Sequence, residues 1–148
     1  KSCQPLTKKI QYVNEVAENT PAVRGNFEQI VQVFRNVLEN AIKYVPADTA
    51  VIRVHAQPEG RALHICIEDN GPGVPEEDQS RIFERFYRVE KDRNSSVEGT
   101  GLGLAICRHI VVNHQGKITV QSPVPETGTG SRFIITLPLA GQAAEDNS

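Results

Sequence analysis

The sequence predicts an α+β two-layer sandwich, in which helices cover one face of a β-sheet. Several segments alternate apolar and polar residues with the period of a strand, and two longer segments have the apolar spacing of a helix. Their order along the chain is strand, helix, two strands, helix, loop, helix, two strands. The 148 residues fit one domain, which we expect at residues 1–139, followed by a disordered tail at 140–148.

The first elements expected are an edge strand and a long helix. Residues 6–16 alternate weakly, as an edge strand can. Asn26 is a good N-cap, and Gln29 stands three residues later, at the capping-box position. From Phe27 the apolar residues recur at helical spacing, and Pro46 ends the pattern.

The rest of the chain changes between extended and helical patterns. Four segments have the period of a strand, and they are residues 50–56, 61–69, 117–122 and 131–139. A dense cluster of turn-forming residues occupies 69–75. A short helix is expected at 76–86, and a second strong helix at 100–114, which Gly116 ends.

Composition excludes several classes of protein. The net charge of −2 gives no overall basic field for nucleic acid. No apolar run approaches the length that spans a bilayer, so we expect no direct membrane contact by this domain. Three cysteines are too few for a disulfide framework, and Cys66, between isoleucines, is expected to be a small buried apolar residue. Because the chain lacks methionine, even at position 1, we expect it to be a piece of a longer protein.

Two asparagines lie one turn apart in the middle of the first helix. With Lys43 and Tyr44, Asn36 and Asn40 fall on roughly the side opposite the apolar stripe. Asparagine is a mediocre residue for a helix interior, because its side chain competes for backbone groups. Either this is a solvated polar face, or the two amide oxygens face a hard cation that phosphates already carry.

Asp69 stands at the end of an apolar strand. It shares parity with Ile65 and Ile67, so it points to the helix side if they do. A carboxylate in that place needs donors, which can be backbone N–H groups of its own turn or a ligand group such as the exocyclic amine of adenine. Gly71 and Gly73 bracket Pro72 and let the backbone approach a flat partner closely.

Three glycines, Gly99, Gly101 and Gly103, lead directly into the second strong helix. Exposed N–H groups and the helix dipole make such a place suitable for phosphate. The Gly-Lys-Ser/Thr ending of a P-loop is missing, and the spacing differs from the dinucleotide fingerprint. Taken alone, this motif is weak.

The order of these pieces is more specific than any one of them. "NVLENAIKY", "DNGPGVP", "IFERFYR", "GTGLGLAI" and "GTGSRF" follow one another with suitable gaps. This series resembles the N, first glycine, F, second glycine and last glycine boxes of the ATP-binding catalytic domain of bacterial sensor histidine kinases, in the superfamily shared with gyrase, heat-shock chaperone ATPases and MutL. The resemblance covers about residues 6–139. It implies the Bergerat fold, a mixed five-stranded sheet with three helices packed on one face.

The resemblance also implies a role for each matching residue. Asn40 would hold Mg²⁺ through its side-chain oxygen with the assistance of Asn36, while Lys43 and Arg88 would neutralise phosphate charge. ATP and Mg²⁺ are the cofactors it implies.

For the base, Tyr44 would lie along adenine, and Asp69 would accept the hydrogen bond of its amine. Gly71 and Gly73 would form the floor of the base pocket, and Ser131 would help to bind the water beside Asp69.

A lid over ATP is expected at about residues 87–100, polar in sequence and hinged at glycines. Phe83 and Phe86 would anchor its front. Its rear hinge and phosphate-binding backbone would be the second glycine box, Gly99, Thr100, Gly101, Leu102, Gly103 and Leu104.

Position 36 favours a kinase over an ATPase. The related ATPases place a water-activating glutamate there, and an amide cannot accept a proton as a general base. None of the four histidines fits the family's acceptor motif. The expected function is therefore to bind Mg-ATP and donate the γ-phosphoryl group to a histidine on a separate dimerisation domain.

The same resemblance implies the partners and the setting. They are the phosphoacceptor domain of the same parent, a response regulator downstream, and a cytoplasmic location under a membrane-associated bacterial parent. Two alternatives are a gyrase- or MutL-like ATPase switch and a non-catalytic or anti-sigma-type nucleotide-binding module.

Overall fold

The computed structural model describes residues 9–85, 87 and 103–140. Five strands form one mixed sheet in the order β1-β2-β3-β5-β4. They are β1 (Ile10–Asn14), β2 (Ala50–Glu59), β3 (Ala62–Asp69), β4 (Lys117–Gln121) and β5 (Ser131–Pro138). Only the β1–β2 pair is parallel. The α+β class and the five-stranded mixed sheet are thus as predicted.

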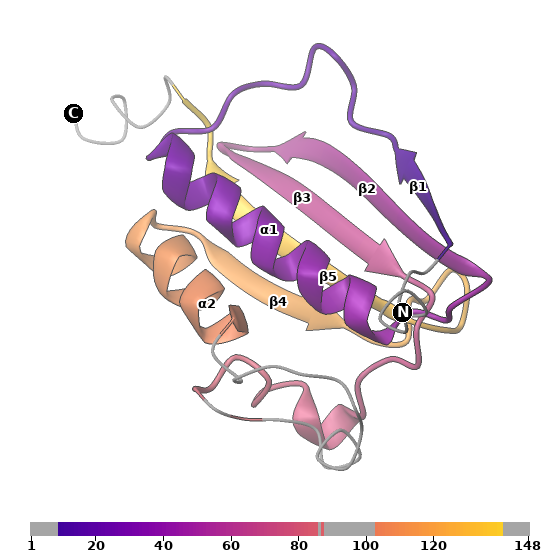
Figure 1. Ribbon diagram of the computed structural model, residues 1–148. Coiled ribbons are helices and arrows are strands. Elements are labelled where there is room, and N and C mark those ends of the chain that lie inside the picture. The colour runs from indigo at the N-terminus through magenta and orange to yellow at the C-terminus, as the bar shows by residue number, and fades with distance from the viewer. Residues whose placement is uncertain (1–8, 86, 88–102, 141–148) are drawn as a thin grey trace, which may run out of the picture.

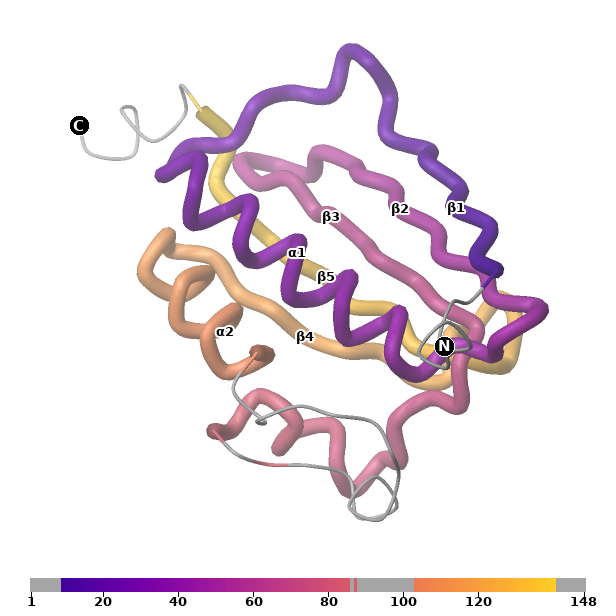
Figure 2. Tube along the Cα trace, in the orientation of Figure 1, coloured from indigo at the N-terminus to yellow at the C-terminus, as the bar shows by residue number. Residues whose placement is uncertain are grey.

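Two α-helices, α1 (Phe27–Tyr44) and α2 (Gly103–Asn113), lie on the same face of the sheet (Figure 1). The tube in Figure 2 shows α1 running across the middle of the sheet, with α2 beside it over β4. The core between the two layers contains fully buried side chains of both, among them Val37, Ile52, Phe133 and Ile135. In the part of the chain that the structure describes, no helix is long and apolar enough to cross a membrane.

The start of α1 is capped as predicted, with one addition. The Asn26 side chain accepts a hydrogen bond from the Gln29 N–H at 2.9 Å. A capping box would return a bond from the Gln29 side chain to the Asn26 N–H. Instead, the Asn26 N–H donates to His114 Nε2 at 3.0 Å. His114, the residue after α2, therefore completes the cap of α1 and has a structural role.

The predicted third helix at 76–86 is wrong as an α-helix. A short 3-10 helix, η2 (Glu76–Asp78), is followed by turns. The backbone bonds of this segment are mostly of the i to i+3 type, such as Arg81 N–H to the Asp78 carbonyl at 2.9 Å and Glu84 N–H to the Arg81 carbonyl at 2.9 Å. They close successive turns in place of a continuous α-helix, and between them Ile82 and Phe83 are both buried. Among the described residues, two α-helices and one 3-10 helix thus replace three helices.

Other boundaries differ by a few residues. The first strand spans 10–14 where 6–16 was expected, and the described part of the second strong helix spans 103–113 where 100–114 was expected. The chain is described up to Ala140, whose N–H donates to the Ala22 carbonyl at 2.9 Å. The expected lid falls almost wholly on residues outside the described ranges, as do residues 141–148 of the expected tail.

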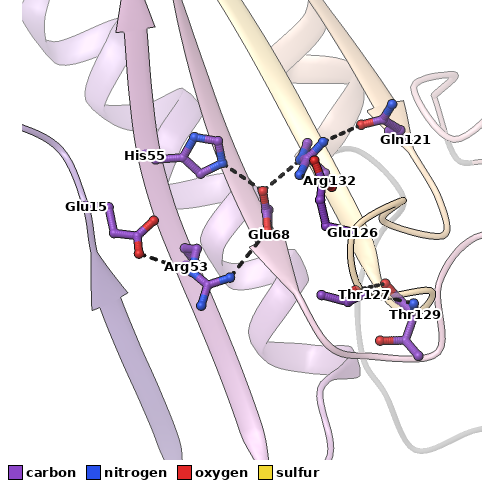
Figure 3. Close-up of polar contacts among 9 residues, drawn as sticks. All are labelled: Glu15, Arg53, His55, Glu68, Gln121, Glu126, Thr127, Thr129 and Arg132. Carbon is purple, nitrogen blue, oxygen red and sulfur yellow. Dashed lines mark hydrogen bonds and ion pairs between the residues drawn. The ribbon is translucent and has the colours of Figure 1, made fainter.

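The sheet face opposite the helices carries a charged network (Figure 3). Glu68 is 8% exposed and lies 2.7 Å from Arg132 Nε and 2.7 Å from His55 Nε2. Burial acts to raise the pKa of Glu68, but hydrogen bonds from His55 and Arg132 outweigh it and leave the pKa lowered. Glu68 pairs in register with Arg132, directly beside the Asp69–Ser131 pair. The network thus fastens β2, β3 and β5 at the end of the sheet where Asp69 lies.

Candidate functional site

Asp69 ends β3 on the helix side of the sheet, as its parity with the buried Ile65 and Ile67 predicts. Its carboxylate accepts a hydrogen bond from the Gly71 N–H at 2.8 Å, and a second from the Ser131 backbone. The expected turn donors are therefore present. Burial nevertheless raises the pKa of Asp69, and the two backbone bonds offset this only in part. A further donor from a ligand would stabilise the carboxylate anion.

Gly71 brings the end of α1 against the end of β3. A Cβ at Gly71 would lie 2.9 Å from the Tyr44 carbonyl oxygen and 3.1 Å from Asp69 Oδ1. Only glycine permits this approach without movement of the Tyr44 backbone. Tyr44, Asp69, Gly71 and Ser131 thus come together from three segments of the chain, the end of α1, the turn after β3 and the start of β5.

A second close approach of backbone segments lies beside the first, at Gly73 and Gly130. Gly73 has φ of +85°, and a Cβ there would lie 2.7 Å from the Ser122 hydroxyl. Gly130, with φ of +74°, lies against the Asp69 backbone, where a Cβ would meet the Asp69 carbonyl oxygen at 1.9 Å. The segments that would floor and flank a base are therefore packed backbone to backbone.

The two helix asparagines have different surroundings. Asn36 is half-buried between the helices, where its Nδ2 donates to the Gly103 carbonyl at 3.4 Å. It also hydrogen-bonds the Cys107 thiol, whose pKa burial raises to about 12. Asn40 is half-buried one turn further along. Because the Asn36 nitrogen faces α2, its oxygen is the atom that could face a cation or its water.

The phosphate end of the predicted site is described only in part. Gly103 begins α2 and is exposed, while Leu104 packs against the core. Lys43 is exposed in the last turn of α1. The other predicted residues of this end lie outside the described ranges, and they are Phe86, Arg88, Gly99, Thr100, Gly101 and Leu102.

Phe83 anchors the segment that leads toward residue 88. It is 7% exposed and meets Phe133 edge to face, with ring centroids 6.1 Å apart. Tyr87 donates its hydroxyl to the buried carboxylate of Asp78, and the Arg81 guanidinium lies 4.7 Å from its ring centroid. The sequence indicated Phe83, but nothing in its pattern pointed to Asp78 as the partner of Tyr87.

A metal held by the protein alone does not fit this site. Within the described ranges, no three His, Cys, Asp or Glu side chains gather where they could hold an ion. Asn36, which contacts Gly103, offers a neutral amide oxygen. Such a donor set fits Mg²⁺ that arrives with phosphates and keeps several waters.

This combination of sheet, helices and ordered motifs defines a nucleotide-binding domain class. Residues 25–141 match the family model described as histidine kinase-, DNA gyrase B- and HSP90-like ATPases. The chain belongs to this family. Within it, the chain is a catalytic ATP-binding domain of the kind found in sensor histidine kinases.

The curated relatives are sensor kinases. The chain is 41% identical over 132 residues to the adaptive-response sensory kinase SasA of Rippkaea orientalis, covering 89% of this chain and 32% of that protein. It is 38% identical over 136 residues to the sensor-like histidine kinase SenX3 of Mycobacterium tuberculosis, covering 90% and 32%. The chain therefore spans about a third of the length of these relatives.

Solved structures agree with this assignment. The mycobacterial sensor histidine kinase MprB matches with a TM-score of 0.75 and 32% identity, over 88% of this chain and 84% of that one. Histidine kinase ThkA, in complex with the response regulator protein TrrA, matches with a TM-score of 0.70 and 26% identity, over 88% and 34%.

Proposed function

We propose that this domain binds Mg-ATP and presents its γ-phosphoryl group to a histidine on a separate dimerisation and phosphoacceptor domain. The observation that carries the proposal is the half-buried Asp69 carboxylate, whose pKa its burial raises despite the bonds from its own turn, at the meeting point of Tyr44, Gly71 and Ser131. A partly desolvated anion with spare acceptor capacity suits the amine edge of adenine.

The base is recognised by this cluster. Asp69 accepts from the exocyclic amine, and Ser131, which is 5% exposed and in register with it, helps to hold the adjacent water. Gly71 and Gly73 allow the backbone to lie flat against the ring, and Tyr44 lies along it. Guanine presents a carbonyl where adenine presents an amine, so an aspartate acceptor selects against guanine.

The phosphates lie toward the junction of α1 and α2. Asn40 and Asn36 would hold Mg²⁺ through their amide oxygens, and Mg²⁺ supplies neutralisation of phosphate charge when bound. Lys43 and Arg88 add positive charge. At the start of α2, phosphate would be bound by backbone N–H groups of the second glycine box, which comprises Gly99, Thr100, Gly101, Leu102, Gly103 and Leu104. Phe83 and Phe86 would fix the front of a lid at about 87–100.

Water is a poor acceptor in this site. Asn36 occupies the place of the ATPase glutamate, and its amide nitrogen already donates to Gly103. An amide cannot remove a proton from water. Phosphoryl transfer therefore depends on positioning an external nucleophile, which the parent's acceptor histidine supplies.

One relative supports a proposal about the downstream partner. The ThkA–TrrA complex pairs a histidine kinase with a response regulator, and we infer the same class of downstream partner here. We place the domain in the cytoplasm of a bacterial cell, within a membrane-associated parent.

A direct test is calorimetric titration of the chain with ADP and GDP, each with Mg²⁺ and with EDTA. The proposal predicts that ADP binds, that Mg²⁺ strengthens binding, and that GDP binds at least tenfold more weakly. Equal binding of ADP and GDP would contradict the assignment of Asp69 to the base.

A further inference from the structure

Ser122 lies outside every motif discussed so far, just past the end of β4. Its hydroxyl accepts a hydrogen bond from the Val74 N–H at 2.8 Å and donates one to the Gly130 carbonyl at 2.7 Å. A single side chain thus joins the end of the first glycine loop to the residue that precedes Ser131.

Gln79 completes the network from the other side. Its Nε2 donates to the Val74 carbonyl at 3.0 Å and to the Ser122 carbonyl at 2.8 Å. Both backbone groups of Val74 are therefore held by side chains, one from Ser122 and one from Gln79. Both donors of the Gln79 amide are used in the process.

The joined segments are those that would contact adenine. Val74 follows directly on Gly73, whose backbone lies so close to the Ser122 hydroxyl that a Cβ would come within 2.7 Å of it. Gly130 lies against the Asp69 backbone and carries Ser131 next in the chain. Loss of the Ser122 hydroxyl would release the glycine loop from Gly130 and leave two partly buried backbone groups without this partner.

We propose that Ser122 and Gln79 are positioning residues for base recognition. They hold the glycine loop at a fixed distance from Asp69 and Ser131, so that the base pocket exists before the nucleotide arrives. This inference rests on the proposed function, because it assumes that adenine occupies this place. It assigns a role in nucleotide affinity to two residues whose side chains bond the backbone of the glycine loop and of Gly130.

A matched control is Thr127, which Figure 3 also labels. Thr127, in the same β4–β5 connection, also accepts and donates through its hydroxyl, with the Thr129 N–H at 3.4 Å and the Thr129 carbonyl at 3.2 Å. It is exposed and bonds only within its own turn. Thr127→Ala therefore removes a comparable hydroxyl from the same connection without touching the glycine loop.

The test measures ADP and GDP affinity by calorimetry for wild type, Ser122→Ala, Ser122→Thr, Gln79→Leu and Thr127→Ala. We expect Ser122→Ala and Gln79→Leu each to weaken ADP binding about threefold to tenfold, the usual worth of one hydrogen bond. The ratio of ADP to GDP affinity should fall with it. Ser122→Thr, which keeps the hydroxyl, should restore affinity, and Thr127→Ala should bind as wild type.

A purely structural role gives a different result. Ser122→Ala would then unfold at lower urea concentration yet bind ADP with wild-type affinity and selectivity while folded, which overturns the inference and leaves the proposed function intact. A wild-type chain that binds no adenine nucleotide overturns both. Should Ser122→Ala fail to fold, Gln79→Leu decides, because its wild-type affinity would equally contradict the inference.

Coupling to Asp69 provides a second arm. If Ser122 acts by positioning the base pocket, Ser122→Ala should reduce ADP affinity much less in an Asp69→Asn background than in wild type. An equal reduction of ADP affinity in both backgrounds would contradict a shared role.

Discussion

Replacement of Asp69 by asparagine should weaken nucleotide binding while stabilising the empty domain. The Asp69 carboxylate is half-buried, and its pKa is raised, first by this burial, with partial compensation from the Gly71 and Ser131 backbone bonds. Asparagine keeps an acceptor for the Gly71 N–H, at 2.8 Å in the wild type, and carries no charge to desolvate. The substitution therefore relieves the empty domain of a half-buried charge.

The sign of the pH dependence follows from the raised pKa. Below the ordinary aspartate pKa, both folded and unfolded wild type are protonated at Asp69, and the charge costs nothing. As the pH rises from there through the raised folded-state pKa, wild type loses stability that Asp69→Asn keeps. The advantage of the variant in free energy of unfolding should thus grow across this window and stay constant above it.

With ADP bound, wild type should be more stable than Asp69→Asn, the reverse of the order expected for the empty domain. A hydrogen bond to a charged group contributes about 1.5–3 kcal/mol, so loss of the carboxylate should weaken ADP roughly tenfold to a hundredfold. Urea unfolding followed by circular dichroism, at several pH values with and without ADP, measures both effects. Asp48→Asn, at an exposed position between α1 and β2, is the matched control.

Two results would refute this reasoning. Equal ADP affinity of wild type and Asp69→Asn would remove the carboxylate from the base pocket. Lower stability of the empty variant at neutral pH would show that the turn alone satisfies Asp69, so that its position reflects folding and not ligand binding.

Three further changes test the phosphate end, the open sheet face and the lid anchor. Asn40→Ala should abolish most of the Mg²⁺ enhancement of ADP affinity and spare the affinity in EDTA; an unchanged enhancement would contradict the ligand assignment. Burial tends to raise the pKa of Glu68, but bonds from His55 and Arg132 lower it, so its stabilisation is complete above the ordinary glutamate pKa and is lost as the pH falls through the lowered value. In Glu68→Gln, the free energy of unfolding measured with urea should therefore fall less steeply at acid pH than in wild type. An unchanged fall would show that the Glu68 network does not contribute to this pH dependence. Phe83→Ala should lower the free energy of unfolding by about 3–5 kcal/mol; a loss under 1 kcal/mol would mean that the site collapses around the smaller side chain.

The sequence predicted those parts of the fold that depend on periodicity and local signals. The cap at Asn26, the stop before Pro46 and the helix-side direction of Asp69 follow from the order of residues alone. The helix expected at 76–86 is replaced by a short 3-10 helix and turns, whose backbone bonds are mostly of the i to i+3 type. Ile82 and Phe83 of this segment pack into the core, and such a tertiary contact is not displayed by the spacing of a single sequence.

The motifs predicted the residues of the site itself, but not the residues that hold them in position. Sequence motifs indicated Asp69, Gly71 and Asn36, and the structure joins Asp69 to Gly71 by a hydrogen bond. Ser122 and Gln79 are single polar residues without any pattern around them. Their function as partners of Val74 arises only in the folded chain, because Ser122 is 48 residues and Gln79 is 5 residues from Val74 in sequence.

Phosphoryl transfer in trans tests the central claim most directly. The chain is incubated with Mg²⁺ and ATP radiolabelled at the γ-phosphate, alone and with the parent's dimerisation and acceptor domain as a separate polypeptide. We predict no label on the chain itself, very slow release of phosphate, and label on the acceptor histidine that is weak because the tether is missing. Vigorous hydrolysis by the chain alone, abolished by Asn40→Ala, with no label on the acceptor domain, would contradict the account and place the chain with the ATPases of its family.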